Sequence, residues 1–245
     1  MNSRPTDERA LLGLLDEGET RSPHERAVLL AGAAGPASDV AIADLPLGLR
    51  DRRVLRLHGL LFGTSVHVQD TCPHCAEVMT CVLTVDQFEE VPPTLATPAR
   101  VELDGWTVTC RALTSTDVAH ALRAPDRAGA RLRLLAACVV DAERDGLPVP
   151  AEVLPPPVAA SVVRAVAEAD PFAELRLCLV CAQCGGSWEA VLDPAHYVWR
   201  ELAYWGRRLM GDVHVLARAY GWREHDVLAV PASRRAVYLG LVRDG

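Results

Sequence analysis

Two Cys-x-x-Cys pairs, far apart in the chain, constrain this sequence more than any other feature. The first pair is Cys72 and Cys75 in TCPHCAEVMTC, and the second is Cys181 and Cys184 in VCAQCGGSW. Aligned at their first cysteines, CPHCAEVMTCVL and CAQCGGSWEAVL reach a Val-Leu step after the same number of residues. Each pair also follows a stretch of alternating apolar and polar residues, which is typical of a strand. This repeat predicts two β-knuckles of the same construction.

The four cysteines together match the ligand set of a structural zinc ion. One knuckle offers two thiolates from a tight turn, whereas structural zinc takes four ligands in a tetrahedron. We therefore predict one Zn²⁺ in a split zinc ribbon, with the intervening chain as an insertion. The predicted ligands are Cys72, Cys75, Cys181 and Cys184. Four thiolates leave no open position for water or substrate, so the predicted role of the metal is structural.

Three alternatives compete with this interpretation. An iron–sulfur run could begin at Cys178, but the further cysteine and the proline of the bacterial pattern are missing. We expect Cys178 to be buried in its strand instead. A thiol oxidoreductase would use a Cys-x-x-Cys redox pair, yet neither pair stands where a strand opens into a helix. His74 could replace one cysteine as a ligand. The predicted core thiols are Cys81, Cys110 and Cys138.

The composition indicates a globular protein without a membrane span. Half of the 245 residues are apolar, and no stretch approaches the ~18 consecutive apolar residues of a transmembrane helix. The N-terminal sequence MNSRPTDERALLGLLDEGE is charged where a signal peptide would be hydrophobic. We therefore expect a cytoplasmic protein with reduced thiols. The net charge of −7 is the wrong sign for binding phosphate backbones and argues against nucleic acid as a partner.

Around the knuckles the pattern predicts strands, and elsewhere it predicts mainly helices. The predicted strands are residues 65–70, 78–85, 174–180 and 187–192, and the run 100–112 predicts a hairpin that turns at Asp104-Gly105. The predicted helices are residues 23–34, 45–63, 115–123, 125–141 and 156–169. The helix at 23–34 starts from the capping box Ser22-Pro23-His24-Glu25. A proline-rich turn or short linker separates the last two helices.

These elements predict an α+β protein that is predominantly helical and built in five consecutive parts. The parts are an N-terminal helical region at 1–63, the first zinc knuckle at 64–94, a hairpin and helical insertion at 95–172, the second zinc knuckle at 173–193 and a C-terminal helical module at 194–245. The metal would then fasten the two knuckles together and fix the position of the insertion between them.

The C-terminal module begins with one long helix after Asp193-Pro194. Its apolar residues recur every three or four positions from Val198 to Tyr220, and Gly221 is placed to end it. Two short helices follow, which gives residues 216–242 the outline of a helix-turn-helix. Only Arg234 and Arg235 supply the basic character of a DNA-reading helix, so a helical docking module is favoured. The alternative function is a zinc-ribbon, helix-turn-helix-like regulator that binds nucleic acid.

The segment VHVLARAYGWREHDVLAVPASRRAVYLGLV resembles the C-terminal signature of the baseplate hub assembly family of the T-even phages. Relatives of that family occur in gene clusters of contractile injection systems, which are phage-tail-like machines. The matching residues are Tyr220-Gly221-Trp222, Glu224, Asp226, Arg234-Arg235 and Tyr238-Leu239. The stretches LPLGLRDRRVLRLHGLLFG, CPHC, DPF and CAQCGG also look like such relatives. The resemblance therefore touches most of the chain.

This resemblance implies a non-enzymatic protein that helps to build, or forms part of, a baseplate. Its partners would be other baseplate, hub or spike proteins of a contractile injection particle. The family brings no catalytic residues, and the sequence contains no phosphate loop, Rossmann fingerprint or Gly-x-Ser-x-Gly elbow. We expect six side chains of the C-terminal module to meet the core or a partner. They are Trp205, Tyr220, Trp222, Arg234, Arg235 and Tyr238.

Overall fold

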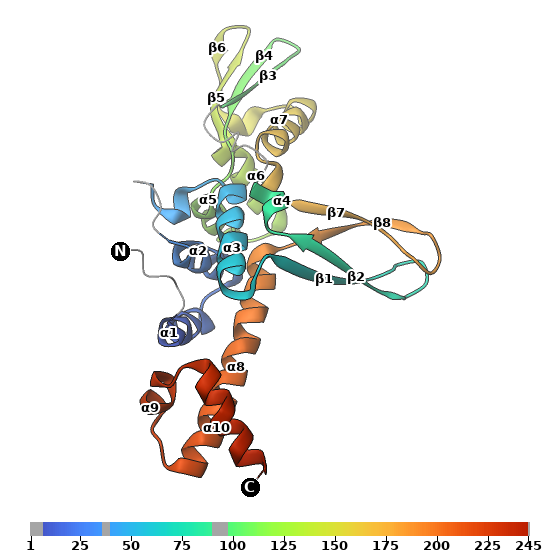
Figure 1. Ribbon diagram of the computed structural model, residues 1–245. Helices are drawn as coiled ribbons and strands as arrows, with labels where there is room; N and C mark the ends of the chain where they lie inside the picture. Colours follow the sequence, from blue (N-terminus) through green and yellow to red (C-terminus); the bar gives the residue numbers. More distant parts are fainter. Residues whose placement is uncertain (1–6, 36–39, 90–97, 245) are drawn as a thin grey trace.

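The computed structural model describes residues 7–35, 40–89 and 98–244. The protein is a mixed helix and sheet structure and is predominantly helical, as the sequence predicted. Figure 1 shows a central helical body from which a sheet lobe, an arm of paired hairpins and a C-terminal helical module project. The predicted boundary between residues 94 and 95 lies outside the described residues. No helix in the described part of the chain is long and apolar enough to cross a membrane.

Helices α1 (Glu8–Glu19), α2 (Pro23–Ala33) and α3 (Leu47–Phe62) form the body together with the first half of α8 (Pro194–Tyr220). The predicted capping box at Ser22 starts α2, as expected. The apolar face of each helix meets the others in one core, and buried side chains of this core include Leu11, Leu30, Val54, Leu57, Val198 and Leu202. A Cβ on Gly18 would overlap the ring of Trp199, so α1 and α8 approach closely there.

The start of α3 receives its cap from a distant segment. Pro46 precedes this helix and offers no side-chain cap, because proline carries no polar side-chain atom. Instead the buried carboxylate of Asp170 accepts a hydrogen bond from the backbone N–H of Gly48 at 3.0 Å. A Cβ on Gly48 would overlap this carboxylate. The DPF stretch therefore connects the insertion to the body through the N-terminus of α3.

Replacing Asp170 with alanine is expected to lower the free energy of unfolding by about 1–2 kcal/mol, because the substitution removes an N-terminal cap. Urea denaturation measures the change, and Glu168→Ala is the matched control. Glu168 lies two residues away, and its side chain is 73% exposed. A loss no larger than that of the control would show that Asp170 does not stabilise α3.

The sheet lobe contains one more hairpin than the sequence predicted. Its four strands follow the chain order: β3 (Ala99–Leu103), β4 (Trp106–Cys110), β5 (Val139–Arg144) and β6 (Leu147–Pro148). Helices α5 (Ser115–Ala121), α6 (Arg127–Cys138) and α7 (Pro156–Ala169) accompany them, with short 3-10 turns at Ile42–Asp44, Ala151–Val153 and Pro171–Ala173 elsewhere in the fold. The hairpin predicted at 100–112 is confirmed as β3 and β4.

The helix predicted at 125–141 is wrong beyond Cys138. At Val139 the chain turns into β5, which pairs with β4 and places Ala142 opposite Val108 in the lobe core. Asp145 and Gly146 then form a tight turn with positive φ of 50° and 80°, as Asp104 and Gly105 do in the first hairpin. The β-branched pair Val139-Val140 and this second Asp-Gly step are strand and turn signals that outweigh the helical spacing.

The arm consists of two antiparallel hairpins that lie side by side (Figure 1). One hairpin is β1 (Ser65–Thr71) with β2 (Val78–Thr84), which leads into α4 (Asp86–Glu89), and the other is β7 (Leu175–Val180) with β8 (Ser187–Leu192). All four predicted strands of the knuckles are therefore confirmed. At the base of the arm, buried Val66 packs with Leu55 of α3 and with Leu175 of β7.

The C-terminal module closes on the second half of α8. Gly221 ends this helix with a left-handed φ of 67°, and α9 (Glu224–Ala229) and α10 (Ala232–Asp244) then fold back against it. Buried Leu216, Val227 and Leu239 form a small core of their own. The module is thus a helical extension with its own packing, carried at the end of a long helix.

Candidate metal centre

The two knuckles have the same backbone construction. In the first, the N–H of Cys72 donates to the carbonyl of Glu77 at 2.8 Å, and the N–H of Ala76 donates back to the carbonyl of Cys72 at 2.9 Å. In the second, Cys181 bonds in the same way to Gly186 and Gly185, both at 2.9 Å. The sequence repeat therefore corresponds to a repeat of backbone hydrogen bonds.

The residue after the second cysteine of each knuckle adopts a left-handed conformation. Ala76 has φ of 60°, and the equivalent Gly185 has φ of 72°. An L-residue other than glycine is strained here by roughly 1–2 kcal/mol, while glycine loses about 0.5–1 kcal/mol more chain entropy on folding. Ala76→Gly is expected to raise the stability by about 0.5–1 kcal/mol, and Gly185→Ala to lower it by about 1 kcal/mol. Thermal unfolding of the two metal-loaded variants checks these opposite signs, and equal signs would contradict the shared construction.

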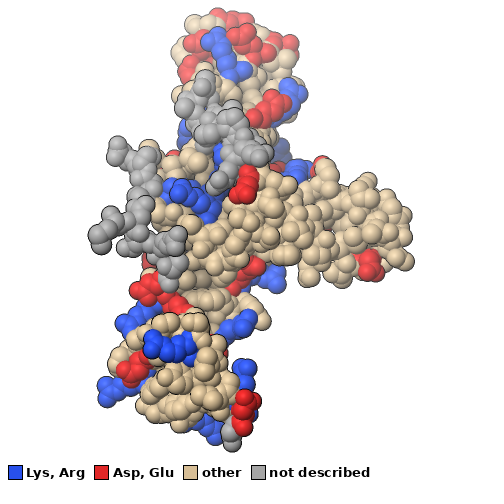
Figure 2. All heavy atoms as spheres, viewed as in Figure 1, with Lys and Arg blue, Asp and Glu red and all other residues tan. Residues whose placement is uncertain are grey.

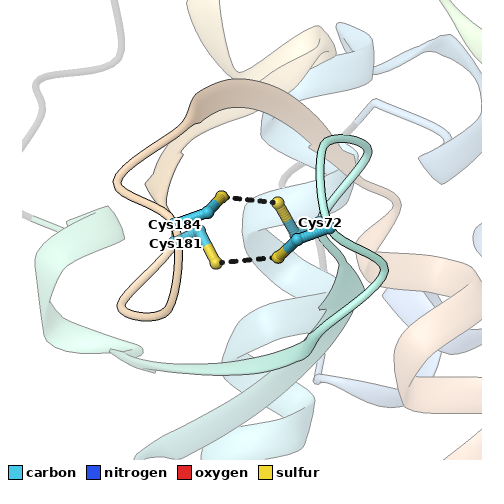
Figure 3. A group of neighbouring side chains, drawn as sticks. Cys72, Cys181 and Cys184 are labelled. Carbon is cyan, nitrogen blue, oxygen red and sulfur yellow. Dashed lines mark hydrogen bonds between the residues drawn. The ribbon is translucent and has the colours of Figure 1, made fainter.

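The two knuckles bring all four predicted ligands together. The four sulfur atoms lie within 4.8 Å of one another. Across the hairpins, the sulfurs of Cys72 and Cys184 are 3.7 Å apart, and those of Cys75 and Cys181 are 3.6 Å apart. Figure 3 draws the contacts between the two knuckles as dashed lines. A tetrahedral ion with metal–sulfur bonds of about 2.3 Å requires sulfurs about 3.8 Å apart. The geometry is therefore compatible with a four-cysteine metal site.

In each Cys-x-x-Cys pair the first cysteine is buried and the second is exposed. Cys72 and Cys181, the first cysteines of the knuckles, are each only 1% exposed, whereas Cys75 and Cys184 lie at the surface. The site is thus anchored on the inner faces of the hairpins and opens toward the tip of the arm. A polar contact beside it also joins the hairpins, because Trp188 Nε1 donates to Asp70 Oδ2 at 2.9 Å.

The thiols influence one another's ionisation. The backbone N–H of Cys184 donates to the sulfur of Cys181 and, with other contacts, lowers the pKa of this thiol to about 7. At Cys75 the backbone N–H of Glu77 lowers the pKa, but desolvation and the three neighbouring thiols raise it to about 12. Thiolates packed this closely repel one another, so all four can ionise together only around a cation.

His74 is not part of the sulfur cluster. It is exposed, and its ring packs over Gly186 of the second knuckle, where an added Cβ would crowd it. Its Nε2 lies 3.4 Å from the carbonyl oxygen of Ser187. The geometry thus places this histidine as a cover over the opposite knuckle.

The burial of Cys178 was predicted wrongly. This cysteine is exposed, because Leu177 and Leu179 occupy the inward positions of β7 and the strand alternation turns Cys178 outward beside Glu189. It therefore points away from the knuckle and does not extend the cluster. The other three cysteines lie elsewhere: Cys110 and Cys138 are buried in the sheet lobe, and Cys81 is half-buried in β2.

The base of the arm contains a polar network that the sequence did not reveal. The backbone N–H of His67 in β1 donates to the hydroxyl of Tyr197 at 3.1 Å, and this hydroxyl donates to Glu201 Oε1 at 3.0 Å. The other oxygen of Glu201 lies 2.7 Å from Nε2 of His58, which is 1% exposed on α3. The network fixes the first knuckle strand to both α8 and α3.

The six predicted contact residues of the C-terminal module take different roles. Tyr220, Trp222 and Tyr238 pack on one another, with ring centroids 5.0–5.8 Å apart. Trp205 packs against the body core. Arg235 is buried and pairs with Glu8, whereas Arg234 is exposed. Most of these side chains therefore hold the module together or fasten it to the body.

The fold and the cysteine cluster define a predominantly helical protein with a four-cysteine site that is compatible with a metal ion. No protein-family model, no curated protein and no solved structure matches the chain.

Proposed function

We propose that the four cysteines bind one structural Zn²⁺ as a split zinc ribbon. The observation that supports zinc is the combination of two knuckles of the same backbone construction with sulfur–sulfur distances of 3.6 and 3.7 Å. Zinc favours four thiolates in a tetrahedron and imposes no other geometry. The ion would fasten two chain segments separated by the whole insertion. Its presence is tested by metal analysis of the purified protein, and iron in place of zinc would contradict this proposal.

We further propose that the protein is a non-enzymatic structural or assembly protein, with a chaperone-like role, of the baseplate or hub of a contractile injection system or phage tail. Its support is the resemblance of residues 213–242 together with the shape of the molecule. Figure 1 shows three projections that leave one body in different directions, which suits a protein that holds several partners. The aromatic signature residues pack on one another in one compact module, which supports a structural role for this segment.

The particle itself provides the test. Antibody detection and mass spectrometry should find the protein in purified injection particles or in their assembly intermediates. A deletion of the gene should leave tubes or spikes that lack a complete baseplate. Absence of the protein from particles and intermediates alike, with normal particles in the deletion strain, would overturn the proposal.

A zinc-ribbon regulator that binds DNA through residues 216–242 is the second candidate. One observation favours it: residues 194–245 hold eight arginines against five acidic residues, in a chain with a net charge of −7. The burial of Arg235 against Glu8 weakens it, because this arginine cannot reach a phosphate or a base. Binding to duplex DNA at low salt distinguishes the regulator from the baseplate protein. A regulator must bind the duplex, and its affinity must fall in the Arg234→Ala variant.

A further inference from the structure

The outer face of α8 carries a stripe of basic and aromatic side chains. Its members recur at intervals of four and three residues and are all exposed, so they share the side of the helix opposite the core. They are Arg200, Tyr204, Arg207, Gly211, His214 and Arg218. No acidic residue interrupts this stripe. An uninterrupted basic face is unexpected in a protein whose residues 1–193 carry a net charge of −10.

The arginines of this stripe are unpaired. None of the described residues forms an ion pair with Arg200, Arg207 or Arg218. Arg208, beside the stripe, lies over the ring of Tyr204 at 5.9 Å. Unpaired surface arginines with an exposed tyrosine among them are typical of a protein contact surface.

A broad hollow of about 950 Å³ follows the same part of α8. Arg200, Tyr204, Arg207 and Arg208 lie along it, with β1 on one side and the start of α10 near its end. Four arginines line the hollow, namely Arg200, Arg207, Arg208 and Arg235, against the three carboxylates of Glu8, Glu201 and Asp212. Glu8 pairs with Arg235, and Glu201 accepts a hydrogen bond from Tyr197, so both carboxylates already have partners other than Arg200 and Arg207. We call this feature the basic hollow.

The end of the sheet lobe has the complementary charge. Five acidic side chains gather on the outer face and turns of the two hairpins of the sheet lobe, against two basic ones: Arg100 pairs with Glu102 at 2.9 Å, and Arg144 lies 3.9 Å from Asp145. The five acidic residues are Glu102, Asp104, Asp141, Glu143 and Asp145. Leu147 stands among them and is 69% exposed, a larger exposed fraction than that of any other large apolar side chain described. Figure 2 shows acidic atoms gathered at the end of the lobe with some basic atoms among them, and we call this end the acidic tip.

We propose that the acidic tip of one copy of this chain docks into the basic hollow of a second copy. The tip is a narrow projection and the hollow is concave, so shape and charge agree. Leu147 and Tyr204, the exposed apolar side chains at the two surfaces, would meet inside a ring of Asp/Glu–Arg contacts. The two surfaces lie on different parts of the chain, so the contact is head-to-tail and builds rings or open chains. This inference is independent of the metal site and of the baseplate proposal.

The first test is the oligomeric state of the intact, metal-loaded protein by sedimentation velocity. At about 50 mM salt we expect association that grows with protein concentration. At about 500 mM salt the association constant should fall at least about tenfold, because exposed charges are screened within a few ångströms there. A protein that remains monomeric at low salt and several hundred micromolar would overturn the proposal.

Charge reversal on each surface identifies the contact. Arg200→Glu with Arg207→Glu makes the hollow acidic, and Asp141→Arg with Glu143→Arg makes the tip basic. Each double variant alone should be monomeric, because its two surfaces then have the same sign. An equimolar mixture should associate again, since the acidic hollow of one variant meets the basic tip of the other.

Arg243→Glu is the matched control, because Arg243 is exposed on α10 and does not line the hollow. It should associate like the unchanged protein. Association that persists in either double variant would place the contact elsewhere and overturn the proposal. A mixture that stays monomeric would also overturn it, because the tip would then not be the group that fills the hollow.

Discussion

Cys181→Ser is expected to release the metal from the purified protein and to unfold the arm. Cys181 is buried between the hairpins and belongs to the second knuckle. The whole insertion separates this knuckle from the first one, so the shared metal would join two segments that are far apart in the chain. Structural zinc sites contribute about 10–16 kcal/mol of apparent binding free energy in small peptides, and this energy is available only to the folded site. Losing one of the four ligands removes most of this binding free energy. Metal analysis by mass spectrometry and thermal unfolding both measure the effect.

Cys178→Ser is the matched control for this substitution. It makes the same chemical change three residues earlier, on the exposed face of β7. We expect full metal content and an unchanged unfolding temperature for this variant. Full metal content in Cys181→Ser would contradict the four-cysteine site, and loss of metal from Cys178→Ser would mean that the exposed cysteine takes part in it.

A chelator should reproduce the loss without a mutation. After removal of the metal, the four thiols lie too close together to ionise freely, so the knuckles should separate and become reactive toward alkylating reagents. Amide exchange should then rise in β1, β2, β7 and β8 while the α2–α3 core stays protected. Exchange that rises equally through the body would mean that the arm and the body unfold as one unit.

The clustering of the four cysteines was predictable because its information is local and repeated. Each knuckle is specified within about a dozen residues by two cysteines, a turn and two alternating strands, and structural zinc demands the second pair. The repeated sequence pattern that starts at Cys72 and again at Cys181 can be recognised even though the two cysteines lie far apart in the chain. The same local logic found the capping box at Ser22 and the helix ending at Gly221, and the structure contains both.

Tertiary contacts decided what the sequence could not predict. At Val139 the chain carries local strand and turn signals, but the helical spacing continues past Cys138 and competes with them, and the pairing with β4 decides between the two. The caps and pairs that join distant segments have no local signal at all. Asp170 at the start of α3 is one example, and Glu201 beside His58 is another. Nothing near Arg235 in the sequence indicates its ion pair, because its partner Glu8 lies on α1, at the other end of the chain.

Arg235→Ala is expected to destabilise the C-terminal module by about 3 kcal/mol, whereas Arg234→Ala should change the stability by less than about 0.5 kcal/mol. The two arginines are adjacent in sequence, but the side chain of Arg235 is only 5% exposed, and its two terminal nitrogens lie 2.6 and 2.8 Å from the oxygens of Glu8. Urea denaturation of both variants gives the comparison. Equal losses at the two positions would show that the pair with Glu8 does not stabilise the fold.

The reverse substitution, at Glu8, removes the partner of the more deeply buried charge. Glu8→Ala leaves the guanidinium of Arg235 buried without a partner, whereas Arg235→Ala leaves a carboxylate that is 24% exposed and can still meet water. Glu8→Ala should therefore cost more than Arg235→Ala, because the stranded charge is more deeply buried. The double variant should cost less than the sum of the two single losses, since no unpaired charge remains. A strictly additive result would mean that α1 and α10 are joined by packing alone, and that this ion pair does not fix the C-terminal module to the body.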